Sequence, residues 1–313
     1  MVLYVLRRLA AGVVLALLAT LITFLLLASS EEGVVRNRLG TGATPDAVAA
    51  AKASMGFDRP VLVQYLDWLG HVARGDFGVS YGSSEPVVSA VTHRLGVTLS
   101  IVLVSMLVSA VVSVALGVFA ASRGGALDRL AQGASLIGNL VPNLLFAIAL
   151  VYVLAIKLHW LPATGYTPLG ESPSRWLASI VIPVIALAIG GAAPLTAQVR
   201  GSMIDELRKD YVRTLRTRGV SGRSIVLRHA LRNAASPALT VLSLQFVAML
   251  GGALIIEQLF ALPGFGTLTF QASQQGDIPV VLGVTVFGVL LVVGVNLLTD
   301  IVNGWLNPKA RLQ

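Results

Sequence analysis

Long uncharged stretches alternate with short charged segments along this chain of 313 residues. Six of the stretches contain 20 to 28 residues without a Lys, Arg, Asp or Glu. A helix needs about 20 apolar residues to cross the hydrocarbon core of a bilayer, which is ~30 Å thick. The pattern therefore predicts six membrane-spanning helices, at residues 9–28, 95–122, 130–156, 176–199, 233–256 and 278–299.

The segments between these stretches predict smaller elements. Residues 258–276 are also uncharged, but they are rich in Gln, Ser, Thr and Gly and contain Pro263, so we expect a loop there. The long segment 29–94 is expected to form a subdomain with one amphipathic helix, predicted by the helical spacing of Leu62, Tyr65, Leu66, Leu69 and Val72. An apolar stripe needs only something to pack on, so this helix either covers helix ends or contacts a partner.

Composition agrees with a polytopic membrane protein. Hydrophobic residues make up 55% of the chain, charged residues only 12%, and the mean hydropathy is +0.81. Soluble domains contain about 25% charged residues. The absence of cysteine from the sequence excludes disulfides and thiolate metal sites, and the four histidines lack metal-ligand spacing. We therefore expect no metal and no cofactor in this chain.

Lys and Arg predict the orientation. With both termini inside, the cytoplasmic segments contain 15 of these residues, whereas the two short outer segments contain two in total. Cytoplasmic loops collect basic residues, so both termini are expected to be cytoplasmic and the segment 29–94 extracytoplasmic. The net charge of +8 follows from the same rule and requires no nucleic-acid partner. The expected organisation is a cytoplasmic terminus (1–8), the first span, the subdomain 29–94, a five-helix core (95–305) and a cytoplasmic tail (306–313).

A basic loop separates the fourth and fifth predicted spans. Residues 200–232 contain nine basic and three acidic residues, so the loop stays outside the bilayer. Apolar residues every fourth position predict one helix over 202–217: Met203, Leu207, Tyr211 and Leu215. Gly219 follows as a left-handed C-terminal cap, Ser221 as the N-cap of a second helix, and Pro237 is expected to open the fifth span.

The residues of this loop leave three interpretations open. The loop could simply satisfy the preference for basic residues on the cytoplasmic side, or it could bind anionic lipid. It could also dock a cytoplasmic partner, because a helix–glycine–helix elbow has a shape suited to insertion in another protein's groove.

Small and polar residues within the spans also allow two interpretations. Ser105, Ser109, Ser113 and Gly117 recur every four residues, which favours close packing of helices over a serine-lined pathway. Elsewhere, Asn139 and Asn143 flank Pro142, so their amides either satisfy the carbonyl freed by the proline or line a path.

Two further polar residues are candidates in the fifth span. Gln245 lies mid-span, where it lines a path or makes an interhelical hydrogen bond. Glu257 ends the span close enough to the outer interface to be hydrated. Asn139, Asn143, Gln245 and Glu257 are therefore the candidate translocation-path residues.

The basic loop resembles a known motif. "DYVRTLRTRG" (210–219) followed by "RHALRNAASP" (228–237) is similar to the EAA loop of bacterial ABC importer permeases, in the form found in the dipeptide/oligopeptide branch. Arg213-Thr214-Leu215 occupies the E-A-A position, Gly219 is the motif glycine, and His229, Leu231 and Arg232 fall in the I-x-L-P region.

Other segments extend the resemblance over nearly the whole chain. "YVLRRL", "GFDRPVLVQYLDWLGHVARGDFGVSY", "IIEQLFALPGFGTL" and "NLLTDIVNGWLNPKAR" are similar to the B-type inner-membrane subunit of peptide permeases. One departure is Ser29-Ser30-Glu31-Glu32-Gly33, where family members often carry a Pro-Gly-Asp-Pro-like turn. The geometry of the outer loop and the substrate class are therefore not fixed by the resemblance.

The resemblance implies an all-α, type I ABC importer transmembrane domain in the bacterial inner membrane. Its partners would be a second homologous permease subunit, two ABC ATPase subunits that bind ATP and Mg²⁺, and an extracytoplasmic substrate-binding protein. Residues 200–236 would be the coupling loop. Tyr211 and Leu215 would fill the ATPase groove, Gly219 would be the hinge, and the polar contacts would include Arg213, Thr214, Arg216, Arg218, His229 and Arg232, with Leu231 beside them.

Absent motifs limit the other functions. The sequence has no P-loop, so ATP hydrolysis must come from another chain. It also lacks GxSxG and HExxH motifs, which disfavours an intramembrane hydrolase. A self-sufficient secondary carrier would be favoured by inverted repeats and a midplane charge, and neither is apparent. The expected function is import of di- or oligopeptides, and the alternative cargoes are a nickel chelate, glutathione or an oligosaccharide.

Overall fold

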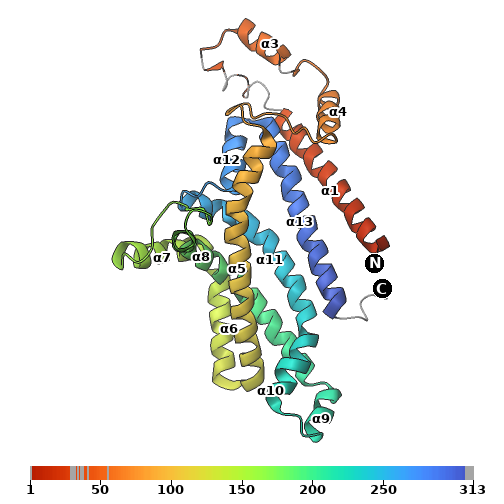
Figure 1. Ribbon diagram of the computed structural model, residues 1–313, viewed down its shortest axis with the longest axis vertical. Coiled ribbons are helices and arrows are strands. Elements are labelled where there is room, and N and C mark those ends of the chain that lie inside the picture. Colours follow the sequence, from red (N-terminus) through yellow and green to blue (C-terminus); the bar gives the residue numbers. More distant parts are fainter. Residues whose placement is uncertain are drawn as a thin grey trace. The chain divides into compact units, whose positions relative to one another are not determined.

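The structure is a computed structural model that describes residues 2–28, 33, 35, 39–40, 42–54 and 56–306. Its regular elements are helices, as predicted; within these residues the one isolated β-bridge pairs Val79 with Pro86. The chain divides into two compact units (Figure 1): residues 1–97 with 263–294 form unit 1, and residues 98–262 with 295–313 form unit 2. Residues 29–32, where the sequence departs from the family turn, and the tail 307–313 lie outside the described residues.

Five helices are long and apolar enough to cross a membrane, which confirms five of the six predicted spans. They lie in α1 (Val2–Ala28), α5 (Val87–Arg123), α8 (Pro173–Leu207), a continuous run of α10 (Gly222–Ser224), η2 (Ile225–Ala230) and α11 (Leu231–Leu259), and α13 (Ile278–Leu306). The π-helical segment η2 makes this run continuous, so the fifth span begins well before residue 233.

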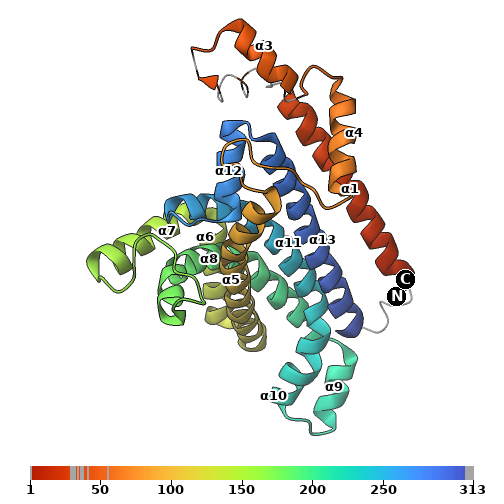
Figure 2. The same cartoon turned by 45° about the horizontal axis from the view of Figure 1, so that its top comes forward.

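The third predicted span is not one helix, so that prediction is wrong. α6 (Gly125–Leu140) ends at Val141, which is extended at φ −85° and ψ 124°. Pro142 follows, and α7 (Asn143–Leu150) then continues into the π-helical segment η1 (Val151–Lys157). A proline disfavours helical geometry at the residue before it and has no N–H for the preceding turn. The chain therefore changes direction here, and α7 leads away from α6 in both views (Figures 1 and 2).

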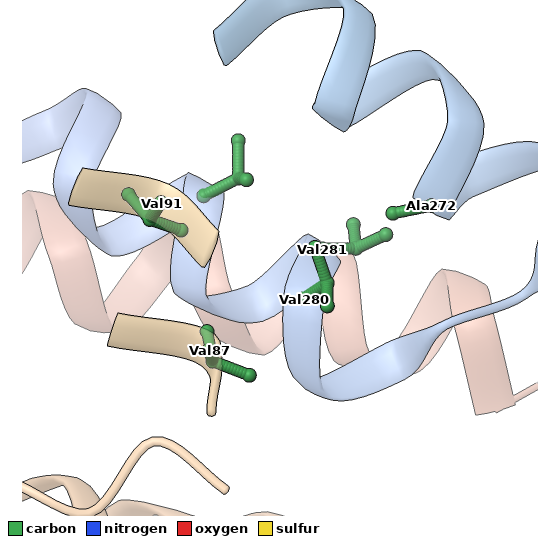
Figure 3. Close-up of a cluster of buried hydrophobic side chains, with 6 residues drawn as sticks. Val87, Val91, Ala272, Val280 and Val281 are labelled. Carbon is green, nitrogen blue, oxygen red and sulfur yellow. The ribbon is translucent and has the colours of Figure 1, made fainter. Parts of the chain in front are cut away.

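The predicted loop over 258–276 is also corrected, because most of it forms α12 (Phe265–Gln275). Gly264 donates its N–H to Thr267 Oγ1 at 3.0 Å at the start, and Gly276 ends the helix at φ +67°. Phe265, Leu268 and Ala272 are spaced for one helical face and pack in a buried cluster of unit 1. Figure 3 shows Ala272 beside valines from the first turns of α5 and α13.

The amphipathic helix predicted in the segment 29–94 is present as α4 (Val61–Val72), which follows α3 (Pro45–Ser54). Tyr65 is buried: its ring lies 5.7 Å from that of Phe24 on α1, and its hydroxyl lies 3.0 Å from Thr20 Oγ1. Leu62 and Leu66 are about 60% exposed, so only part of the predicted stripe packs on the protein.

In unit 2, α5 and α8 are joined by a regular ladder of hydrogen bonds. Three serines one turn apart donate to three α8 carbonyls one turn apart: Ser105 to Val184 (3.3 Å), Ser109 to Ala188 (2.9 Å) and Ser113 to Ala192 (2.9 Å). One turn further, a Cβ on Gly117 would overlap Val199. The serines are buried, so the close-packing interpretation is confirmed and the pathway interpretation is not.

Candidate functional site

The elbow, which we define as residues 206–233, connects α8 to α11 at one end of unit 2 (Figures 1 and 2). The single helix predicted over 202–217 is two helices, because α8 ends at Leu207 and α9 (Asp210–Thr217) begins after an extended Lys209. Asp210 places a carboxylate in the first turn of α9, where the helix dipole favours it. Met203 is buried within unit 2, whereas Tyr211 and Leu215 are half-buried on α9.

Gly219 ends α9 as predicted. It adopts φ +73°, a conformation that costs residues with a Cβ about 1–2 kcal/mol. Its N–H donates to the Arg216 carbonyl at 3.0 Å, and the next N–H, of Val220, donates to the Leu215 carbonyl at 3.1 Å. These two bonds form a Schellman motif, which closes the helix end and reverses the chain.

The second half of the elbow runs directly into α11. Ser221 is extended and precedes α10, as expected of an N-cap, but its side chain makes no capping hydrogen bond. Pro237 lies inside α11 and does not open it, so that prediction is wrong. At this position the proline leaves the carbonyl of Asn233 without its usual N–H donor.

A buried carboxylate, Glu206, holds the elbow together. It accepts hydrogen bonds from Tyr211 Oη at 2.9 Å, from Asn233 Nδ2 at 2.9 Å and from the Lys209 ammonium, and it is only 5% exposed. These bonds connect the end of α8 to α9 and to the start of α11. We call this set the Glu206 cluster. Sequence analysis missed it; the spacing of Glu206 and Lys209 on adjacent helical turns was the available signal.

The same contacts alter the acidity of Tyr211. Burial raises the pKa of the Tyr211 phenol, and so does the hydrogen bond that the phenol donates to Glu206. The phenol therefore stays in its neutral, donating form to a more alkaline pH than an ordinary tyrosine does.

The other predicted coupling residues lie around this cluster. The exposed ones are Arg213, Thr214, Arg216, Arg218 and Arg232, whereas His229 and Leu231 are half-buried. The arginines on α9 therefore present a basic surface that nothing within the described part of unit 2 covers, while the apolar and carboxylate groups hold α9 in place.

A cavity of about 490 Å³ lies between the helices of unit 2. Its lining residues are all uncharged and come from the α6–α7 break, from α8 and from α11. Asn143 and Gln245, two of the predicted path residues, lie together in this lining. Pro142 and Pro194 also line it, and neither has an N–H to give to the carbonyl four residues earlier, at Gly138 and Gly190. The cavity therefore offers hydrogen-bonding groups without net charge.

Two adjacent glycines on α8 create room for the amides. A Cβ on Gly190 would overlap the side-chain amide of Asn143. A Cβ on Gly191 would overlap Met249 and lie 3.7 Å from Gln245 Oε1. Both positions therefore require glycine because the side chains of Asn143 and Met249 approach the backbone closely, and not because of the backbone conformation.

Of the remaining two path candidates, Glu257 is not in this lining. The side chain of Asn139 lies outside the described residues. Glu257 is fully buried and accepts a hydrogen bond from Thr98 on α5, so the expectation that it is hydrated near an interface is wrong. Sequence position placed Glu257 near the end of a span but could not show that neighbouring helices cover it.

Comparison with known proteins identifies the family. Residues 113–312 match the model of "Binding-protein-dependent transport system inner membrane component", and residues 1–102 match the model of its N-terminal region. The chain of the MetNI methionine ABC transporter, solved in inward-facing conformations, superposes with a TM-score of 0.55 at 16% identity. The match covers 72% of this chain and 99% of that one, so the two share a fold.

Curated relatives match over greater lengths at higher identity. A putative peptide transport system permease protein of Brucella abortus is 36% identical over 308 residues, covering 98% of both chains. Oligopeptide transport system permease protein AppB of Bacillus subtilis is 35% identical over 258 residues, covering 81% of this chain and 82% of its own. By full-length sequence and by fold, this multi-pass membrane protein belongs to the family of inner-membrane components of binding-protein-dependent transport systems.

Proposed function

We propose that the chain is a permease subunit of an ATP-driven importer of di- or oligopeptides. The observation that carries the proposal is the course of α8. One end of this helix forms the Glu206 cluster of the elbow, and its middle lines the cavity with Gly190, Gly191 and Pro194. One continuous helix thus connects the basic surface of the elbow, which we place on the cytoplasmic side, to the polar cavity.

The elbow is the proposed port for mechanical work. Because the sequence has no P-loop, ATP and Mg²⁺ would bind to two partner ATPase subunits and this chain would be non-catalytic. The half-buried Leu215 and the exposed arginines of α9 suit a groove lined by apolar and acidic groups. We propose that Gly219 is the hinge and that His229, Leu231 and Arg232 complete the contact.

The cavity is the proposed half of a translocation path. Asn143 and Gln245 would exchange hydrogen bonds with a passing solute as the path opens alternately to the two sides. The names of relatives from two bacterial genera support a peptide cargo. A second homologous permease would supply the other half, an extracytoplasmic binding protein would deliver the solute, and both termini would be cytoplasmic. A path role for Glu257 and for Asn139 remains a prediction.

Reconstitution tests the proposal. The chain would be assembled in vesicles with the products of neighbouring genes, and ATP turnover would be measured with the binding protein and a panel of di- and tripeptides, nickel chelates, glutathione and oligosaccharides. Stimulation by peptides, with uptake that requires ATP, is the expected result. Stimulation by another solute alone would contradict the cargo. Accumulation of a solute by the purified chain without partners would contradict the proposed mechanism.

A further inference from the structure

A second hollow, of about 290 Å³, lies in unit 1 and is distinct from the cavity described above. It is lined by residues of the turn before α5, by the first turns of α5, by α12 and by the start of α13. Its size is near the lower end of the ~300–1,000 Å³ typical of small-molecule sites. By the predicted orientation, it opens on the extracytoplasmic side.

Asp277 is the buried charge of this hollow. It is 3% exposed, and its Oδ2 accepts hydrogen bonds from Ser80 Oγ at 2.5 Å and from the Gly82 N–H at 3.2 Å. Its other oxygen, Oδ1, is buried and has no hydrogen-bond partner within the described part of the chain. A buried carboxylate oxygen without a donor is costly, so a donor from outside the protein would stabilise it.

Capping of α13 does not explain this carboxylate. Asp277 precedes the helix, and its carbonyl accepts the Val281 N–H at 3.0 Å. The side chain, however, turns to the 80–82 turn, and Pro279 has no N–H to offer. Oδ2 therefore anchors the turn, and neither this anchor nor helix capping accounts for the burial of Oδ1.

The rest of the lining carries charges of both signs. Glu85 lies in it together with Asp277, and Arg94 supplies a guanidinium. The arginine disfavours a bare metal cation, which it would repel, whereas a zwitterion satisfies both signs. The amide of Gln275 adds a neutral group, 3.0 Å from the position that a Cβ on Gly82 would occupy.

We propose that this hollow binds a short peptide zwitterion by its charged ends, with the terminal ammonium donating to Asp277 and the carboxylate paired with Arg94. The site would receive the peptide on the extracytoplasmic side. The inference rests on the proposed peptide cargo, because the ammonium that would donate to Asp277 is the free amino terminus of a peptide.

Dialanine is a suitable probe. Its binding would be measured in the absence of the binding protein, so that the selectivity of the binding protein does not affect the result. The chain, assembled with its partner subunits in nanodiscs, would be titrated with dialanine by saturation-transfer NMR. Asp277→Asn keeps an oxygen that can accept from Ser80 and Gly82 but removes the charge. Loss of a charge-assisted hydrogen bond is expected to weaken dialanine binding about tenfold or more. N-acetyl-dialanine should bind the unmodified protein about tenfold more weakly than dialanine, and the variant should not distinguish the two ligands.

Two further variants separate this role from a structural one. Asp58→Asn removes an exposed charge of unit 1 that does not line the hollow and should leave binding unchanged. Ser80→Ala removes the anchor but keeps the charge, so it should retain the preference for the free amine. Equal loss of both ligands in Asp277→Asn would show an anchor only and overturn the inference, as would undiminished dialanine binding. Either result is compatible with ATP-driven peptide uptake, whereas failure of uptake would contradict the proposed function.

Discussion

The elbow and the cavity of unit 2 both contain part of α8, but they differ in the charge of their side chains. The elbow contains exposed arginines around one buried carboxylate, and the groups that satisfy this carboxylate come from three segments of the chain. Among the described residues, the lining of the cavity consists of amides, glycines, prolines and apolar groups, without a charged side chain. Charge is thus kept where a partner protein or water can reach it, while the interior offers directional hydrogen bonds that do not trap an ion.

The comparison also shows how the two regions are coupled. Twelve residues of α8 separate Pro194 in the cavity from Glu206 in the elbow, a distance of roughly 18 Å along a helix. The serine ladder fastens the preceding part of α8 to α5. A displacement of α9 would therefore be transmitted to the cavity along α8, which is fixed to α5 on one face. The following variants interrupt that connection in the elbow or in the cavity.

The largest effect is expected from Glu206→Ala. The substitution leaves Lys209, Tyr211 and Asn233 without their shared acceptor and should cost at least about 3 kcal/mol, since three hydrogen bonds to a charged group are lost. The unfolding temperature of the purified chain and the rate of ATP-dependent uptake by the reconstituted complex should both fall. Asp205→Asn, one residue away and exposed, is the matched control and should change neither. Normal uptake in Glu206→Ala would show that the cluster is dispensable for coupling.

Gly219→Pro tests the hinge itself. Proline cannot adopt φ +73° and cannot donate the N–H that closes α9, so a penalty of about 3 kcal/mol falls on the elbow alone. ATP hydrolysis by the complex should persist while peptide uptake is lost, as measured in the same vesicles. Gly222→Ala, at the first position of α10 and without a positive φ, should retain coupled uptake. Coupled uptake in Gly219→Pro would contradict the proposed hinge.

In the cavity, Gly190→Ala should act more mildly. The added methyl group would overlap the Asn143 amide and displace it, at a cost of about 1–3 kcal/mol for overpacking. Uptake should fall several-fold with ATP hydrolysis still responsive to the binding protein, because the elbow is unchanged. Gly201→Ala, on the same helix with open space around it, is the control. Equal losses in both variants would indicate a general effect on α8 and not one on the path.

Sequence patterns predicted the features that depend on neighbouring residues. Uncharged runs of sufficient length gave α1, α5, α8, α11 and α13, since the bilayer imposes length and polarity directly. The motif glycine, Gly219, gave the end of α9 because a left-handed cap is a local requirement. The spacing of Ser105, Ser109 and Ser113 correctly favoured close packing.

Features that depend on long-range contacts were missed or mistaken. Hydropathy cannot distinguish one helix from two joined at Pro142, and α12 was hidden because Gln, Ser and Thr make up six of its eleven residues. The Glu206 cluster joins residues 206 and 233, and although the spacing of Glu206 and Lys209 is local, no local pattern shows that residues 206 and 233 meet. Asp277 likewise contacts Ser80 across nearly two hundred residues of sequence.

The smallest effect, and the finest test of the elbow, is expected from Tyr211→Phe. The variant removes one hydrogen bond to Glu206 and should cost about 1.5 kcal/mol, the low end for a bond to a charged group, because Tyr211 is only half-buried. Because the pKa of Tyr211 is raised in the folded chain, its contribution is fully present below the pKa of an unfolded tyrosine and is lost as the pH rises through the higher, folded value. The difference in thermal stability between the unmodified chain and the variant should therefore be constant near neutral pH and shrink at strongly alkaline pH. Tyr166→Phe, in the loop before α8, controls for general alkaline unfolding. A difference that stays constant through alkaline pH would show that the phenol contributes through packing of its ring and not through its proton, and it would remove Tyr211 from the polar connection between α8 and α9.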